Sequence, residues 1–180
     1  VREVMLDHQT AEVVLDYPQG VKELHREFLR AGAEVMVAFT YYAHREKLQV
    51  IGRSTDLRAM NSQALRIARE TAAEGNAFVA GNLSNTWRYD PSDPDRSKRI
   101  IAPMFEEQVR WMSIEGADLV IAETFDYLGE ALLALEAIKK ASFTAMITFS
   151  PKGETTFDGV DWADACLQLE RSGADIVGFN

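Results

Sequence analysis

Cysteine and long hydrophobic runs are the features this sequence has least of. Cys166 is the single cysteine among 180 residues, which excludes an intrachain disulfide and a cysteine-rich zinc module built from this chain alone. No apolar run approaches the roughly 20 residues that a helix needs to cross a bilayer. The segment from Val1 to Asp7 also lacks the basic and apolar regions of a signal peptide. These absences favour a reducing, cytoplasmic setting without a membrane partner.

Positive charge is also scarce. The chain has 19 Lys and Arg against 28 Asp and Glu, giving a net charge of -9. Nucleic-acid binding without sequence preference needs a basic surface, so RNA and DNA are unfavourable partners. At 47% hydrophobic and 26% charged residues, the composition is typical of one globular domain. Val1 stands where an initiator methionine is usual, which suggests a processed or excised chain.

Short apolar runs alternate with segments whose apolar residues recur every three or four positions, as in strands and amphipathic helices. The expected helices cover residues 18–30, 60–74, 99–115, 128–141 and 160–171. The expected strands cover residues 35–42, 77–83, 118–125, 143–149 and 175–180. This order predicts an α/β fold with a parallel sheet, either open or closed into a barrel.

The two kinds of connection differ in length. Four helices end at glycines that accept the left-handed conformation and serve structure: Gly32, Gly75, Gly116 and Gly173. Loops after three of the strands are longer, covering residues 43–59, 84–98 and 150–156. Ligands of parallel α/β folds bind where the strands end, so polar residues there are the candidate site.

Glu123 interrupts the apolar strand segment 119–122. A buried carboxylate needs a partner because an isolated buried charge is costly. Two interpretations are open: an arginine of the chain, or the ammonium group of a ligand.

Aromatic and amide side chains occur at the other strand ends. Tyr41, Tyr42 and Trp87 can form an aromatic wall for an organic cation, or they can pack in the core. Alternation along a strand predicts that only one of the two tyrosines faces inward. Asn82 and Asn180 each offer a donor and an acceptor to a polar substrate.

The residues needed for Schiff-base chemistry or for a histidine metal site are not found in a suitable arrangement. No expected strand carries a lysine, which disfavours Schiff-base chemistry. His8, His25 and His44 are scattered, which disfavours a histidine metal site. We expect His25 to lie on the surface or to have its hydrogen bonds satisfied within the fold. Cys166 lies inside a helix, and we expect it to be a small core or semi-buried residue.

At these residues the chain resembles the homocysteine S-methyltransferase family, and most closely its betaine–homocysteine branch. The resemblance covers almost the whole chain. It rests on residues 17–32, 39–43 with Lys47 and Leu48, 121–125 with Glu130 and Ala131, and 173–180.

The resemblance implies a (β/α)8 TIM barrel in which zinc, held by three cysteines, lowers the pKa of the homocysteine thiol. The thiolate attacks a methyl group of a small donor and methionine forms. By this resemblance Glu123 holds the amino-acid ammonium, Tyr42 faces the donor, and Asn180 ends the strand that precedes the first zinc cysteine. The full expected substrate-binding set is Glu123, Tyr42, Thr40, Asn82, Thr124 and Asn180.

The chain also departs from the family pattern. It stops before the first zinc cysteine and lacks the later Cys-Cys pair and the first strand. We therefore expect the middle of a barrel, incomplete at both ends, whose zinc ligands lie outside this chain. Gln9 and Thr124 stand where the betaine enzymes have aromatic residues, so the donor stays open among quaternary ammonium, sulfonium and other methyl carriers.

Two further hypotheses belong to other classes. A partial barrel exposes strand edges, which is compatible with a non-catalytic binding or assembly module that forms homo-oligomers. An open doubly wound sheet with another chemistry is the third.

Overall fold

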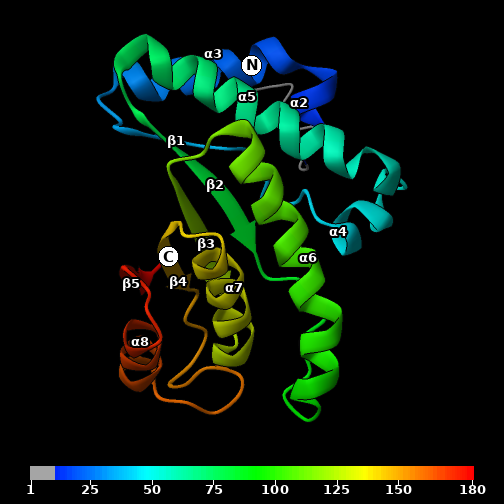
Figure 1. The fold of residues 1–180 in the computed structure, drawn as a ribbon, viewed down its shortest axis with the longest axis vertical. Coiled ribbons are helices and arrows are strands. Elements are labelled where there is room, and N and C mark those ends of the chain that lie inside the picture. The colour runs from blue at the N-terminus through cyan, green and yellow to red at the C-terminus, as the bar shows by residue number, and fades with distance from the viewer. Residues whose placement is uncertain (1–10) are drawn as a thin grey trace. The chain divides into compact units, whose positions relative to one another are not determined.

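The computed structural model describes residues 11–180 (Figure 1). The features of residues 1–10, which include His8 and Gln9, lie outside the described part. The helices are α2 (Val13–Asp16), α3 (Pro18–Arg30), α4 (Arg45–Val50), α5 (Leu57–Gly75), α6 (Pro94–Glu115), α7 (Leu128–Lys140) and α8 (Trp162–Arg171), with a 3-10 turn, η1, at Ser54–Asp56. The strands are β1 (Val35–Val37), β2 (Phe78–Ser84), β3 (Leu119–Phe125), β4 (Thr144–Phe149) and β5 (Ile176–Phe179).

The strand order in the sheet follows the chain, β1-β2-β3-β4-β5. The pairs β1/β2, β3/β4 and β4/β5 are parallel, which confirms the α/β class. Contacts divide the chain into two compact units: unit 1 holds residues 11–82 and 111–118 of the described chain, and unit 2 holds residues 83–110 and 119–180.

Unit 1 packs the helices α3 and α5 on one another and α5 on β1. Pro18 occupies the first turn of α3, where its missing N–H costs nothing. Val21 of α3 and Met60 and Leu65 of α5 are buried, as is Met36 of β1. At the surface, ion pairs such as Arg26–Glu74, at 2.7 Å, also join α3 to α5. Periodic apolar residues thus form the core of this unit.

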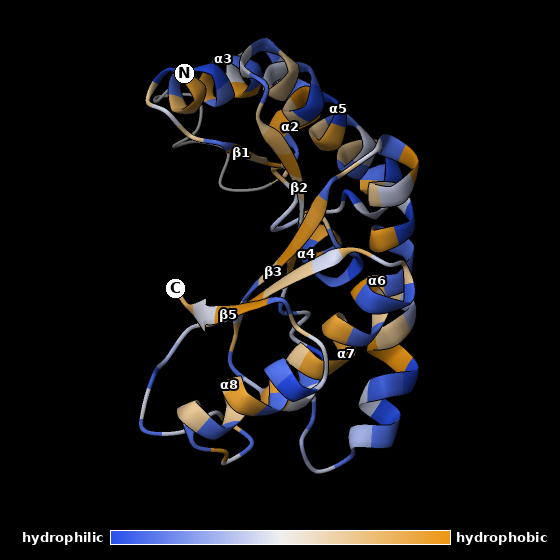
Figure 2. Cartoon of the chain, turned by 60° about the vertical axis from the view of Figure 1, so that its left-hand side comes forward, coloured by the Kyte–Doolittle hydropathy of each residue, from blue (hydrophilic) through white to orange (hydrophobic). Residues whose placement is uncertain are grey.

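Unit 2 is built around β3, β4 and β5, with α7 in contact with β3 and β4. Leu135 of α7 and Ile147 of β4 are buried. Phe105 of α6 meets Phe125 of β3 edge to face, with ring centroids 6.2 Å apart. In Figure 2 the helices combine hydrophobic and hydrophilic residues, whereas β3 is coloured mainly as hydrophobic. Val120 and Ala122 of β3 are buried, whereas Leu119 and Ile121 on its other face are half-buried.

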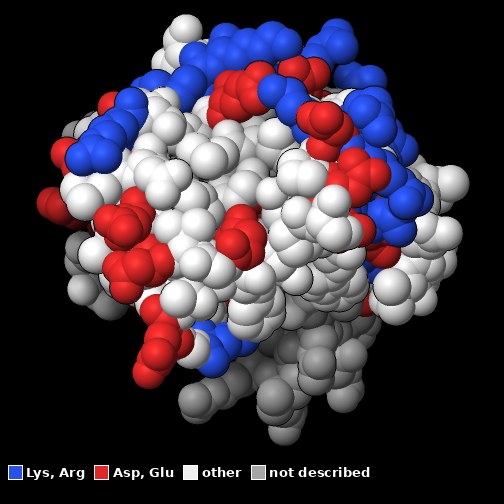
Figure 3. Space-filling model, turned by 90° about the horizontal axis from the view of Figure 1, so that it is seen from below, with Lys and Arg blue, Asp and Glu red and all other residues white. Residues whose placement is uncertain are grey.

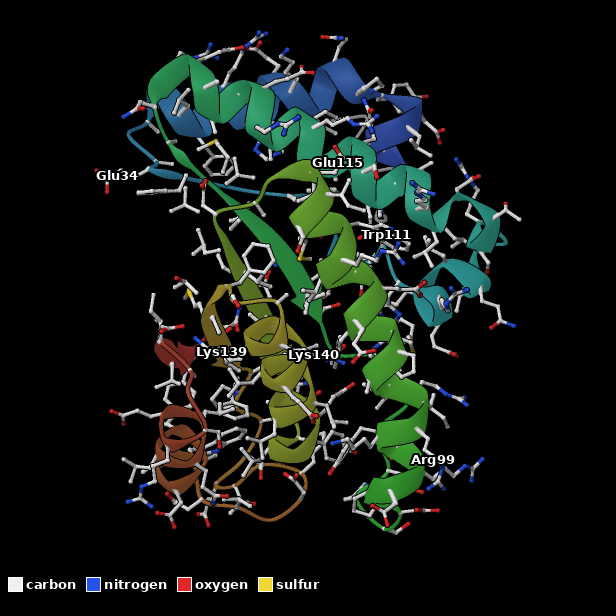
Figure 4. The ribbon with its side chains drawn as sticks, in the orientation of Figure 1. Glu34, Arg99, Trp111, Glu115, Lys139 and Lys140 are labelled. Carbon is white, nitrogen blue, oxygen red and sulfur yellow. The ribbon has the colours of Figure 1, made fainter. Side chains whose placement is uncertain are left out.

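Aspartates fix the start of two strands. Asp118 Oδ2 accepts the Val79 N–H at 2.8 Å within unit 1. Asp175 Oδ2 accepts the Ala145 N–H at 2.7 Å within unit 2, and it also pairs with Lys139 at 2.9 Å. Figure 4 labels Lys139 at the end of α7. Both aspartates follow a Gly-Ala pair, so the glycine joints are structural, as expected.

One glycine joint differs from its prediction. Gly32, Gly116 and Gly173 have positive φ, but at the end of α5 the left-handed residue is Asn76, with φ 56°. Asparagine tolerates this conformation. Gly75 packs closely against α3: a Cβ there would lie 2.6 Å from Leu29 Cδ1, so a larger residue would require the Leu29 side chain to shift.

The long loops are more structured than the sequence predicts. The segment 43–59, expected to be irregular, contains α4 and η1, and α6 begins at Pro94 inside the expected loop 84–98. The expected strand 35–42 ends at Val37. Its last residues turn instead, because the Ala43 N–H bonds to the Thr40 carbonyl at 2.8 Å.

The surface carries both signs of charge. On the face shown in Figure 3, acidic and basic side chains lie side by side. Within residues 11–180, no helix combines the length and the apolar composition needed to span a membrane.

Candidate functional site

A β-bulge lies at the carboxyl end of β3. Ala122 pairs with Ile147 of β4, but the next pair is Phe125 with Phe149, so β3 has one extra residue. Thr124 has φ 65°, a left-handed conformation that is rare and strained for a β-branched residue. The bulge places Glu123 and Thr124, both half-buried, between the buried residues Ala122 and Phe125. It thereby turns the two polar side chains out of the regular alternation.

Asn180 holds this bulge from the neighbouring strand ends. Its Nδ2 donates to Glu123 Oε2 at 3.0 Å. Its Oδ1 accepts the Thr124 backbone N–H at 3.2 Å and the Thr148 hydroxyl at 2.6 Å. One amide thus links three strands and orients the Glu123 carboxylate.

Asn85 supports the bulge at the carbonyl group of Thr124. Its Nδ2 donates to the Thr124 carbonyl at 2.9 Å. Both backbone groups of Thr124 are therefore satisfied by side chains rather than by a strand ladder. Such over-determined strain is typical of functional sites.

Thr40 and Asn82 meet in unit 1. The Thr40 hydroxyl donates to the Asn82 backbone carbonyl at 2.7 Å, and both side chains are buried, 1% and 2% exposed. This bond ties the turn after β1 to β2.

Tyr41 and Tyr42 both pack on one lysine. The Lys47 ammonium lies 4.2 Å from the Tyr41 ring centroid and 5.0 Å from that of Tyr42, and it donates to the Tyr41 carbonyl at 3.3 Å. The strand ends at Val37, so strand alternation does not apply to the two tyrosines, of which Tyr41 is half-buried. The Tyr42 side chain remains 37% exposed.

The structure therefore gathers the six expected residues into separate groups. Glu123, Thr124 and Asn180 form one hydrogen-bonded cluster in unit 2, which we call the Glu123 cluster. Thr40 and Asn82 meet in unit 1, where Tyr42 packs on Lys47.

Sequence reasoning missed three residues of these groups. Asn85 and Thr148 were not assigned to the site, although both follow or end expected strands, and Lys47 was not recognised as the cation beside the tyrosines. One signal was available for the bulge: Ala122 and Phe125 are three apart, which breaks a strand's period of two.

The described residues do not fit a zinc site. Within residues 11–180, no three His, Cys, Asp or Glu side chains are grouped as metal ligands. Cys166 is half-buried on α8, as expected, and burial raises the pKa of its thiol. His25 is only 8% exposed, so the alternative of a surface location is wrong.

Comparison with known proteins defines the family. The family model for homocysteine S-methyltransferase matches residues 2–180, and the chain therefore belongs to this family. It is 35% identical over 175 residues to betaine–homocysteine S-methyltransferase 1 of Sus scrofa, covering 95% of this chain and 62% of that protein. For the rat enzyme of the same name the identity is also 35%, and the chain spans 42% of that relative.

A solved structure shows the fold. The metallated homocysteine methyltransferase MmuM of Escherichia coli superposes with a TM-score of 0.74 at 22% identity, over 94% of this chain and 65% of that one. Its apo form gives 0.75 at 20% identity, over 99% of this chain and 68% of that one. These matches confirm the expected barrel lineage of the α/β fold.

Proposed function

We propose that this chain is part of an enzyme that transfers a methyl group from a small donor to the thiol of homocysteine, giving methionine. The observation that carries the proposal is the family match over residues 2–180. The Glu123 cluster at the carboxyl ends of the strands supports it, because this is where parallel α/β folds bind ligands.

In this proposal the Glu123 carboxylate receives the ammonium group of homocysteine through charge-assisted hydrogen bonds. Asn180 and Thr124 position that carboxylate, through the 3.0 Å bond from Asn180 and the bulge at Thr124. The bulge is held by hydrogen bonds on both sides, so the carboxylate is oriented before the ligand arrives, which reduces the entropic cost of binding.

Tyr42 is proposed to face the methyl donor, and Thr40 and Asn82 are proposed as further substrate-binding residues. The exposed part of the Tyr42 ring is available to a ligand, while the Lys47 ammonium already lies beside the ring. The Lys47 ammonium repels a cationic donor, so such a donor would contact the exposed part of the Tyr42 ring away from Lys47.

The transfer balances without a redox partner. A sulfur–carbon bond forms, the donor's bond from methyl carbon to nitrogen or sulfur breaks with its electron pair, and the thiol proton is released. The donor leaves as a neutral amine or thioether if it begins as a quaternary ammonium or a sulfonium ion.

The proposal also includes zinc as the cofactor and a cytoplasmic setting. Cys166 is the sequence's only cysteine, and the described residues do not fit a three-cysteine site. No step is therefore assigned to the metal through residues of this chain.

A donor screen tests the proposal. The full-length gene product is incubated with homocysteine and, separately, with betaine, a dimethylsulfonium compound and S-methylmethionine, and methionine is quantified by mass spectrometry. Formation of methionine with one donor is expected. No methionine with any donor class, from a folded protein supplied with zinc, would contradict the proposal.

One observation favours a second function, assembly with another copy. Phe78, Ile176 and Phe179 are strand residues that are 61%, 46% and 52% exposed, and exposed apolar strands favour association. A binding or assembly module predicts oligomers in sedimentation or size-exclusion experiments. A monomer would remove this alternative.

A further inference from the structure

A cavity in unit 2 is lined by none of the six residues of the candidate site. Its volume is about 210 Å³. Four of its lining residues are aromatic: Trp87, Tyr89, Tyr127 and Phe157. Two carboxylates, those of Asp126 and Glu130, also line it. The cavity therefore combines aromatic faces with negative charge.

The aromatic rings form a connected wall. The Tyr127 ring centroid lies 5.2 Å from that of Tyr89 and 5.5 Å from that of Phe157, the latter pair edge to face. Gly129 makes room for this wall, because a Cβ there would overlap the Tyr89 hydroxyl. Trp87 is 60% exposed and has φ 64°, so a strained backbone presents a large apolar ring to solvent.

The cavity has a negative electrostatic environment. Glu130 is 1% exposed and accepts hydrogen bonds from the Thr86 N–H and hydroxyl through Oε1. Burial, and then the charges of Asp158 and Glu130, raise the pKa of Tyr89. Carboxylates and aromatic faces together attract cations.

The ammonium group of Lys152 already lies between a carboxylate and an aromatic ring of this lining. Lys152 Nζ lies 2.9 Å from Asp126 Oδ1 and 5.7 Å from the Phe157 ring centroid. The Asp126 side chain is 14% exposed, but that of Lys152 is 55% exposed. The anionic side of the pair is thus fixed in the lining, and its cation comes from a half-exposed side chain that another cation can displace.

We propose that this cavity binds a small organic ammonium ion, whose cationic head takes the place of the Lys152 ammonium between Asp126 and the Phe157 ring. The aromatic wall contacts the alkyl groups of the ion. The lining includes none of Glu123, Thr124 and Asn180, but it does include Asn85, which donates to the Thr124 carbonyl, so the cavity adjoins the Glu123 cluster.

The neighbouring cavity provides a contrast. It has a volume of about 280 Å³ and shares Trp87 and Tyr89, but its lining includes Arg88 and Arg96 beside one carboxylate, that of Asp90. Two guanidinium groups against one carboxylate disfavour a cation there. The balance of charge in the lining therefore distinguishes the proposed site from its neighbour.

Choline and its neutral isostere 3,3-dimethylbutan-1-ol provide the test, with no homocysteine present. Saturable shifts of the Trp87 indole and of backbone amides in residues 127–130 are expected in NMR titrations with choline. The alcohol is expected to bind roughly three-fold or more weakly. Equal binding of the two compounds would overturn the proposal.

Two variants with matched controls locate the site. Phe157→Ala should weaken choline binding roughly three-fold or more, whereas Phe28→Ala, similarly exposed in unit 1, should not. Lys152→Ala should tighten binding about two- to five-fold by removing the competing cation, whereas Lys140→Ala, which loses a surface pair with Glu106, should not. Weaker binding in Lys152→Ala would contradict displacement.

A further variant separates this proposal from the function proposed above. Tyr42→Ala should leave choline binding unchanged, because Tyr42, the residue proposed to face the methyl donor, does not line the cavity. If Tyr42→Ala weakened choline binding as much as Phe157→Ala did, the cation would lie in the candidate active site and the proposed cavity would be wrong.

Discussion

The side-chain amide of Asn180 donates to the Glu123 carboxylate at 3.0 Å, joining residues that are 57 positions apart. The other atom of the same amide, Oδ1, accepts the N–H of Thr124. Asn180, which follows β5, thus fixes both residues of the bulge in β3. The Asn180 side chain thus helps to orient the proposed ammonium-binding group.

Asn180→Asp tests that role. The substitution puts two carboxylates at hydrogen-bond distance and removes the donor, so the free energy of unfolding should fall by about 1 kcal/mol at pH 7. Denaturant titration measures the change. Gln168→Glu, the same change from amide to carboxyl at an exposed position of α8, serves as the control. Equal stability of Asn180→Asp and the wild type would show that the cluster contributes little.

Thr124→Gly tests the strain in the bulge. Glycine accepts φ 65° without penalty, so its usual cost in a strand should be offset and stability should stay within about 0.5 kcal/mol of the wild type. Thr144→Gly, at an exposed regular position of β4, should lose about 1 kcal/mol. Similar losses at the two positions in thermal unfolding would mean that Thr124 carries no strain.

His25 should make stability depend on pH. Burial lowers the pKa of His25 in the folded state, so the folded state disfavours the protonated ring. The unfolded histidine titrates at about pH 6.5, and its contribution to stability is present above that pH and lost as the pH falls.

The measurement is the change in melting temperature between pH 7.5 and 5.5 for the wild type and for His25→Gln. The wild type should lose more stability on acidification than the variant. Parallel curves would show that His25 does not contribute to the acid sensitivity.

The helices and strands could largely be predicted from periodicity, because apolar residues at spacings of two or of three and four reflect burial. The helix Pro18–Arg30 agrees at both ends. The segment 35–42 did not follow its apolar pattern: the chain turns after Val37, with the Ala43 N–H bonded to the Thr40 carbonyl, and Tyr41 and Tyr42 then pack on Lys47 of α4. A contact that depends on a later helix is not visible in the strand's own sequence.

The site could be predicted in part. Glu123 stands out as a charge in an apolar strand, and the sequence indicated that it needs a partner. That Asn180 provides a hydrogen bond, and that Asn85 and Thr148 support the bulge, depends on the register between strands far apart in the chain. Residue type alone contains no information on that register.

Homocysteine binding by the full-length gene product, compared with its Glu123→Gln variant by calorimetry, tests the central claim most directly. The account predicts that the variant loses about ten-fold or more in affinity and that Glu106→Gln, a surface control, keeps the wild-type value. Wild-type affinity in Glu123→Gln would contradict the assignment of Glu123 as the ammonium-binding group.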